Sequence, residues 1–120
     1  MAVVLDTDKE PGIDLQTWHQ RIEQIQHKFL GSDEQEMIGP EPELLTLAWC
    51  AKEAAYKWHG KKGVEFIEEL PIVDFQKWGD KNMNIYFKLS KVPQMVFLES
   101  LITADFACSY IVHVQDWVIY

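Results

Sequence analysis

Apolar and polar residues alternate along the C-terminal part of the chain, which predicts the strands of an antiparallel sheet. Met83, Ile85 and Phe87 are apolar, and more polar side chains fall between them. Such alternation is typical of a strand with one face buried and the other facing solvent. The candidate strands cover residues 72–78, 82–90, 94–99 and 104–114. WGDKN, at 78–82, is typical of a hairpin turn between the first two.

Two short segments near the N-terminus are also rich in β-forming residues. They are AVVLD at 2–6 and GIDLQ at 12–16, with a turn at 7–11 between them. Alternate side chains of a strand share a face, so Asp14 and Gln16 are predicted to point to one side. The apolar residues on either side of Asp14 would then point into the core.

Helical spacing of apolar residues predicts two helical regions after this strand. Thr17 and Gln20 form a capping-box pattern at the start of the first, and Gly31 ends it. Its apolar residues are Trp18, Ile22, Ile25 and Phe29. Residues 32–35 repeat the capping-box pattern, which predicts a short helix that ends near Gly39.

The longest helix is predicted at 43–59, with Gly60 as its C-terminal stop. Its apolar residues form a broad stripe of Leu44, Leu45, Ala48, Trp49, Ala51, Ala55 and Trp58. A stripe of this width indicates a helix packed deep against a sheet. The predicted fold class is therefore α+β, with helices packed on an antiparallel sheet.

Length and composition favour one globular domain at 1–120. The chain has 120 residues, of which 48% are hydrophobic, so it can bury a core and is not expected to be disordered. No run of about 18 apolar residues predicts a membrane span. The N-terminus lacks the basic start and apolar stretch of a secretion signal. We therefore expect a cytoplasmic protein that does not bind membranes.

The net charge narrows the class of partner, and the cysteines indicate the redox compartment. The formal net charge is −8, which disfavours general nucleic-acid binding because that usually needs a basic surface. An acidic average still allows a local basic patch that binds an anionic ligand. Cys50 and Cys108 form no metal-binding or disulfide pattern, and both have apolar neighbours. They are predicted to be buried free thiols in a reducing compartment.

One segment of this acidic chain is basic. Residues 49–63, WCAKEAAYKWHGKKG, hold four of the eleven basic residues and a single acid, Glu53. Glu53 and Lys57 are four residues apart on the predicted helix and so share a face. One interpretation is a surface ion pair that slightly stabilises the helix. The other is a ligand site, because Lys52 and Lys57 leave the segment positive and suited to phosphates.

Oxygen ligands for a divalent cation are also present. Mg²⁺ often takes one or two carboxylates, together with substrate phosphates and water. Asp14 on the strand and Glu53 on the helix could be those two carboxylates if their elements pack together, and Gln16 could hold a metal-bound water. HGKKG, at 59–63, combines glycines with Lys61 and Lys62 but lacks the spacing of a P-loop.

These two segments resemble the signature motifs of the 4'-phosphopantetheinyl transferase superfamily. The first motif reads Gly-hydrophobic-Asp-hydrophobic, and GIDL at 12–15 is similar to it. The second reads aromatic-Ser/Cys/Thr-x-Lys-Glu-Ala/Ser-x-x-Lys, and WCAKEAAYK at 49–57 contains every fixed position. The segment between them and the β-rich tail also look like the family, so that the resemblance covers roughly residues 2–113.

The resemblance implies an enzyme that moves the phosphopantetheine arm of coenzyme A onto a serine of an acyl or peptidyl carrier protein. It implies Mg²⁺ held by Asp14 and Glu53, with Gln16 beside them, and bridged to the coenzyme A pyrophosphate. It assigns the catalytic roles to Glu53 and Lys57. Coenzyme A would be bound by the lysines of the basic segment, which are Lys52, Lys57, Lys61 and Lys62. A metal and lysines around a pyrophosphate supply the positioning and charge neutralisation that phosphoryl transfer needs.

Two departures from the family keep an alternative open. Many larger members have Glu two residues after the motif Asp, where this chain has Gln16. The larger class also fuses two similar halves, and this chain resembles the second half, although its length is that of holo-acyl-carrier-protein synthase. We therefore expect a homo-oligomer, with a dimer favoured over a trimer. The alternative is a non-catalytic relative that binds coenzyme A or a carrier protein, or a half that needs a partner.

Overall fold

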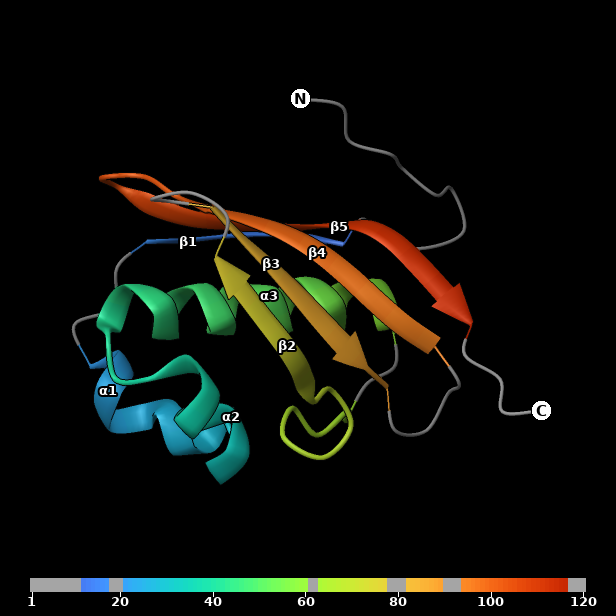
Figure 1. Cartoon of the computed structure of the whole chain (residues 1–120), viewed down its shortest axis with the longest axis horizontal. Helices are drawn as coiled ribbons and strands as arrows, with labels where there is room; N and C mark the ends of the chain where they lie inside the picture. The colour runs from blue at the N-terminus through green and yellow to red at the C-terminus, as the bar shows by residue number, and fades with distance from the viewer. Residues whose placement is uncertain (1–11, 18–20, 61–62, 78–81, 90–93, 117–120) are drawn as a thin grey trace.

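The protein folds into a five-stranded antiparallel sheet with helices on one face, as a computed structural model shows (Figure 1). The structure describes residues 12–17, 21–60, 63–77, 82–89 and 94–116, the last without its side chain. The strands are β1 (Ile13–Thr17), β2 (Ile72–Lys77), β3 (Asn82–Lys88), β4 (Gln94–Ile102) and β5 (Phe106–Asp116). They lie in the order β1-β5-β4-β3-β2, which places the N-terminal strand at one edge.

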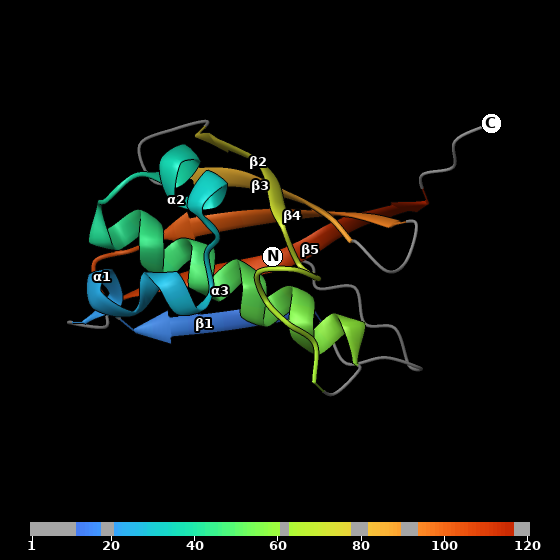
Figure 2. The same cartoon turned by 90° about the horizontal axis from the view of Figure 1, so that it is seen from below.

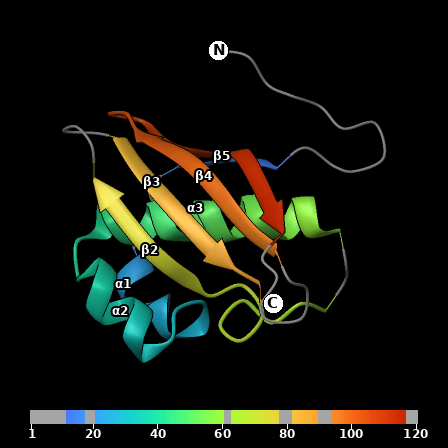
Figure 3. The same ribbon diagram turned by 45° about the vertical axis from the view of Figure 1, so that its right-hand side comes forward.

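The helices are α1 (Ile22–Ile25), the 3-10 helix η1 (Gln26–Lys28), α2 (Ser32–Ile38) and α3 (Pro42–His59). Within the described residues they all lie on the same side of the sheet, and Figure 3 shows α3 crossing behind the strands. The predicted α+β class is confirmed. The four predicted C-terminal strands are present and differ from the predicted ranges by a few residues at their ends.

Helix α3 is the central element of the core. Pro42 occupies its first turn, where a missing N–H costs nothing. Gly60 ends it in the left-handed conformation (φ 74°), and the Gly60 N–H donates to the carbonyl of Tyr56 at 3.1 Å. The helix packs against β1, β4 and β5, and Figure 2 shows it running alongside β1. Its middle turns are buried, as the broad apolar stripe predicted.

The predicted capping residues of the first two helices were wrong. Thr17 does not cap a helix, because β1 continues through it and α1 begins only at Ile22. Helix α2 begins at Ser32 as predicted, but the capping residue is Gly31. The Glu34 carboxylate reaches back and accepts a hydrogen bond from the Gly31 N–H at 3.0 Å, which is the acidic half of a capping box. Pairing with β5 extends β1, and tertiary pairing of this kind overrides a local capping signal.

The two faces of β1 are the reverse of the prediction. Asp14 is 5% exposed and faces α3, whereas Leu15 is 59% exposed on the open side of the sheet. The prediction assumed that the apolar residues of an amphipathic strand face the core. Here the residues of α3 that face β1 are polar, so the buried side of this strand is its polar side.

Some predictions fall outside the described residues. These are the strand at 2–6, the turn at 7–11 and most of the turn at 78–82. The strands that flank the last turn do pair antiparallel, with Lys77 opposite Met83. Within the described part of the chain, no helix is both long enough and apolar enough to cross a membrane.

Candidate active site

One face of α3 packs against β1 and contains Glu53 and Lys57, two of the candidate site residues. Cys50, Glu53 and Lys57 are spaced three and then four residues apart, so they lie on one face of the helix. Helix α3 and β1 run side by side in Figure 2. This packing brings the strand that carries Asp14 against the helix that carries Glu53 and Lys57, although 43 residues separate Asp14 from Lys57.

Asp14 is the residue on which these contacts converge. The Lys57 ammonium lies 2.6 Å from Asp14 Oδ1 and forms a salt bridge with it. The Gln16 amide nitrogen donates to the other carboxylate oxygen at 2.6 Å. Both oxygens of a nearly buried carboxylate are therefore engaged by donors, as a buried charge requires.

Lys57 is the solvent-facing member of the cluster. Its side chain is 42% exposed, so the ammonium pairs with Asp14 while it stays open to solvent or to a ligand. The hydrogen bond to Asp14 is the main reason that its pKa is raised, and the charges of Asp14 and Glu53 act in the same direction. Lys57 therefore carries a full positive charge at neutral pH.

Glu53 lies within electrostatic reach of both of these residues. Partial burial raises its pKa, and the negative charge of Asp14 raises it further, while Lys57 opposes the change. Partial burial and the neighbouring negative charge thus disfavour the charged form of Glu53. An added cation would favour that charged form.

Cys50 connects α3 to the same strand through a buried hydrogen bond. Its Sγ lies 3.0 Å from the backbone carbonyl of Asp14 and 3.6 Å from that of Ala107 on β5. Both cysteines are buried free thiols, as predicted. The contact with Asp14 was not predicted. The signal that could have found it is the motif position itself, since the motif that this segment resembles reads Ser, Cys or Thr there, the small side chains with a hydrogen-bond donor.

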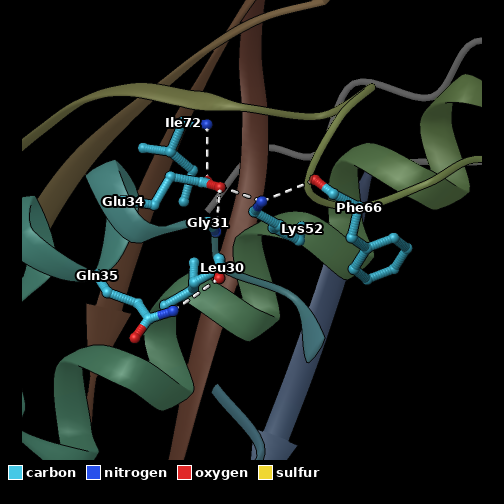
Figure 4. Close-up of polar contacts among 7 residues, drawn as sticks. All are labelled: Leu30, Gly31, Glu34, Gln35, Lys52, Phe66 and Ile72. Atoms are coloured by element: carbon cyan, nitrogen blue, oxygen red, sulfur yellow. Dashed lines mark hydrogen bonds and ion pairs between the residues drawn. The ribbon is translucent and has the colours of Figure 1, made fainter. Parts of the chain in front are cut away.

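Lys52 lies elsewhere, and its expected place in an exposed basic patch is wrong. Its side chain is 0% exposed, and its ammonium is 2.7 Å from Glu34 Oε2 and 2.7 Å from the carbonyl oxygen of Phe66 (Figure 4). Lys52 follows Cys50 by two residues, so it leaves the helix on a different side from the stripe that faces β1. A fully buried and paired ammonium in this position does not contact a ligand at Asp14.

The Lys52 ion pair belongs to a network that ties four segments together. Glu34 Oε2 also accepts from the backbone N–H of Ile72 at 3.0 Å, and Oε1 accepts from that of Gly31. Figure 4 shows Lys52, Glu34 and these partners in one cluster between α2, α3, β2 and the segment that contains Phe66. Burial lowers the pKa of Lys52, and the Glu34 carboxylate counteracts this. Satisfied networks of this kind fix the relative positions of the elements that they join.

The residues around Asp14 include oxygen donors that could hold a magnesium ion. Two carboxylates, Asp14 and Glu53, are accompanied by the amide of Gln16. No group of three or more His, Cys, Asp or Glu residues that could hold a metal occurs among the described residues. Mg²⁺ needs few protein ligands, since it takes the remaining ones from substrate phosphates and water, so the residues fit this ion. Lys61 and Lys62 lie outside the described residues.

Comparison with known proteins identifies a family for this arrangement. Residues 10–111 match the family model of the 4'-phosphopantetheinyl transferase superfamily. The matched range contains Asp14, Glu53 and Lys57, and it spans most of the 120 residues. Neither a curated protein nor a solved structure matches the chain.

Proposed function

The chain belongs to the 4'-phosphopantetheinyl transferase superfamily, and on this premise we propose that it transfers the phosphopantetheine arm of coenzyme A to a serine of an acyl or peptidyl carrier protein. The observation that carries this proposal is the convergence of the two motif segments on Asp14. Lys57 contacts its carboxylate and Glu53 lies within its electrostatic field.

Asp14 and Glu53, with Gln16 beside them, would hold Mg²⁺ in this proposal. When bound, the ion would neutralise charge on the pyrophosphate of coenzyme A. Burial and, after it, the charge of Asp14 raise the pKa of Glu53, and a bound cation would counteract both effects. Gln16 adds no negative charge, so we expect weaker metal binding than from a third carboxylate.

Lys57 would bind the phosphates. Its exposed ammonium can contact an anionic ligand placed over the Asp14 carboxylate. Charge builds up on the phosphate oxygens as the bond between the two phosphates breaks, and a fixed ammonium stabilises that charge. In this proposal Lys61 and Lys62 add positive charge for the same ligand.

Glu53 would act as the general base. The serine oxygen of the carrier protein forms a bond to the phosphorus that carries the pantetheine arm, and the bond to the nucleotide phosphate breaks. The serine proton must leave in this step, and the Glu53 carboxylate would accept it. The acidic carrier and the acidic chain would meet through the local positive charge of this site.

The proposal also includes a second copy of this chain as partner. Leu15 and Val112 are 59% and 50% exposed on the strand pair β1 and β5. The described helices cover only the other side of the sheet (Figure 1). Exposed apolar residues on one strand pair favour association, and a dimer is the commonest closed assembly.

Mass spectrometry tests the proposed reaction. A carrier protein incubated with the chain, coenzyme A and Mg²⁺ should gain the mass of one phosphopantetheine arm. Lys57→Ala should lower the transfer rate on the order of a hundredfold, because one preorganised charge contact is lost. Lys77→Ala, which removes an exposed lysine on β2, is the matched control and should leave transfer unchanged. A wild-type chain that modifies no carrier protein would contradict the proposal.

A binding protein without catalysis is the second candidate. The observation that favours it is that Lys57 and Gln16 already satisfy both oxygens of Asp14, so the ion pair would be permanent and structural. Such a relative would bind coenzyme A with equal affinity in the presence and absence of Mg²⁺, and would transfer nothing. An enzyme would bind coenzyme A more tightly with Mg²⁺, and Glu53→Gln would abolish the difference.

A further inference from the structure

Helix α3 holds Asp14 at two points that belong to different turns of the helix. Lys57 contacts the carboxylate, and Cys50, seven residues earlier, contacts the backbone carbonyl of the same residue. The two contacts are independent, since one uses the side chain of Asp14 and the other its main chain. The Lys57 contact can be exchanged for a ligand, whereas the Cys50 contact is fully buried.

We propose that Cys50 is a positioning residue, whose thiol fixes β1 against α3 and so places the Asp14 carboxylate opposite Glu53 and Lys57. Its importance for catalysis rests on the proposed function, but its effect on the strand does not. The thiol donates to the carbonyl of Asp14, with the carbonyl of Ala107 as a second acceptor at 3.6 Å. It therefore lies over the junction between β1 and β5.

The chemistry of Cys50 suits a permanent donor and excludes a nucleophile. Its side chain is 0% exposed, so no substrate reaches the sulfur. The buried thiol lies 3.0 Å from the backbone carbonyl of Asp14, where its S–H can donate a hydrogen bond.

Strand β1 needs such an anchor because of its place in the sheet. Among the described strands it lies at the edge and pairs with β5, so it has one described neighbour instead of two. Edge elements with few partners open more readily than central strands. A carboxylate on this strand can serve a phosphoryl transfer only if it stays within a fraction of an ångström of its working position.

Three substitutions at Cys50 separate the hydrogen bond from packing. Ser keeps a donor of similar size, whereas Ala and Val both remove the donor. Ala also leaves a void, and Val fills most of the volume of the cysteine. Cys108 offers a matched control, because it is also a buried thiol and its β5 position pairs with Leu15, next to Asp14. Cys108→Ala removes a thiol from the neighbouring strand without removing the bond to Asp14.

Peptide-resolved amide hydrogen exchange on the unliganded chain tests the anchor without any need for activity. Cys50→Ala and Cys50→Val should speed exchange in the segment 12–17 by roughly threefold to tenfold, the effect expected from the loss of one hydrogen bond. Exchange in β3 should not change. Cys50→Ser should restore slow exchange, and Cys108→Ala should leave the segment as in the wild type.

Transfer kinetics give the second measurement. Cys50→Ala and Cys50→Val should raise the Mg²⁺ concentration needed for half-maximal transfer by roughly the same factor, and Cys50→Ser should stay near the wild type.

Unchanged exchange at 12–17 in Cys50→Val would overturn the proposal. So would a uniform rise in all strands, because that would mark a loss of core packing alone. If the wild type transfers nothing, the proposed function fails, but the exchange result still decides the role of Cys50.

Discussion

At the scale of the residue, the candidate site is a group of charges whose balance depends on Glu53. Burial and the charge of Asp14 both raise its pKa, which means that the folded protein holds the Glu53 proton more tightly than the unfolded chain does. The resulting stability is fully present below the ordinary value of 4.5 and is lost as the pH rises through the raised value. At neutral pH the charged Glu53 therefore lowers the stability of the fold.

Glu53→Gln should remove this loss of stability at neutral pH. We expect the variant to melt at the same temperature as the wild type at pH 4 and on the order of one degree higher at pH 7 to 8. Differential scanning calorimetry across this pH range measures the difference. Glu68→Gln, at an exposed acid, is the control and should show no such trend. A Glu53→Gln protein that is less stable at neutral pH would show that Glu53 supports the fold instead of the site.

At the scale of the element, β1 and β5 approach each other so closely at Gly12 that no side chain fits. The Gly12 carbonyl accepts from the Ile111 N–H at 2.8 Å, and a Cβ at Gly12 would lie 2.7 Å from Ile111 Cγ1 and closer still to Cδ1. Gly12→Ala should therefore destabilise the protein by about 1–3 kcal/mol through overpacking. Urea denaturation measures the change.

A second substitution checks the cause of this loss. Ile111→Ala removes the two nearest atoms that an added Cβ would meet and leaves Cβ of residue 111 at 3.1 Å, so Gly12→Ala should cost less in that background. Equal costs in the two backgrounds would contradict the steric explanation.

The Lys52–Glu34 network makes a separate prediction about the packing of α2, α3 and β2. Lys52→Met leaves the buried Glu34 carboxylate without its cation and should cost about 3–5 kcal/mol in urea denaturation. Adding Glu34→Gln should recover part of that loss, because the uncompensated charge disappears. Lys28→Met, at an exposed lysine, is the control. A double variant no more stable than Lys52→Met would argue against ionic pairing as the reason for the loss.

At the scale of the whole molecule, the sheet has one open face in the described structure. Phe97 on this face contacts Tyr86 edge-on and His113 at a tilt, with ring centroids 4.9 and 5.4 Å away. We expect the chain to sediment as a dimer at micromolar concentration. Leu15→Glu should weaken the dimer about tenfold or more, while Met37→Glu, at an exposed position on α2, should not.

Salt adds a second check on association. Two copies of a chain with net charge −8 repel each other, so the dimer should tighten as the ionic strength rises from 0.01 M to 0.15 M. A chain that remains monomeric at both salt concentrations would contradict the proposed second copy.

The sequence by itself determined the elements, the family and the identity of the candidate residues. Alternation at 82–90 and the broad stripe at 43–59 are local patterns, because each strand or helix must bury its own apolar face. Glu53 and Lys57 could be selected because one motif fixes their spacing, and Asp14 because a second motif places it after Gly12 and Ile13. The superfamily resemblance that they carry is confirmed by the match at 10–111.

Only the tertiary structure decided how the charged residues divide between site and core. Lys52 and Lys57 look alike in the sequence, five residues apart on one helix, yet one is 0% exposed and the other 42%. The difference depends on which segments pack on each side of α3, and that is set by pairings between residues far apart in the chain. The same applies to β1: its polar face is buried because Cys50 and Lys57 lie beneath it, and no pattern within five residues of strand contains that information.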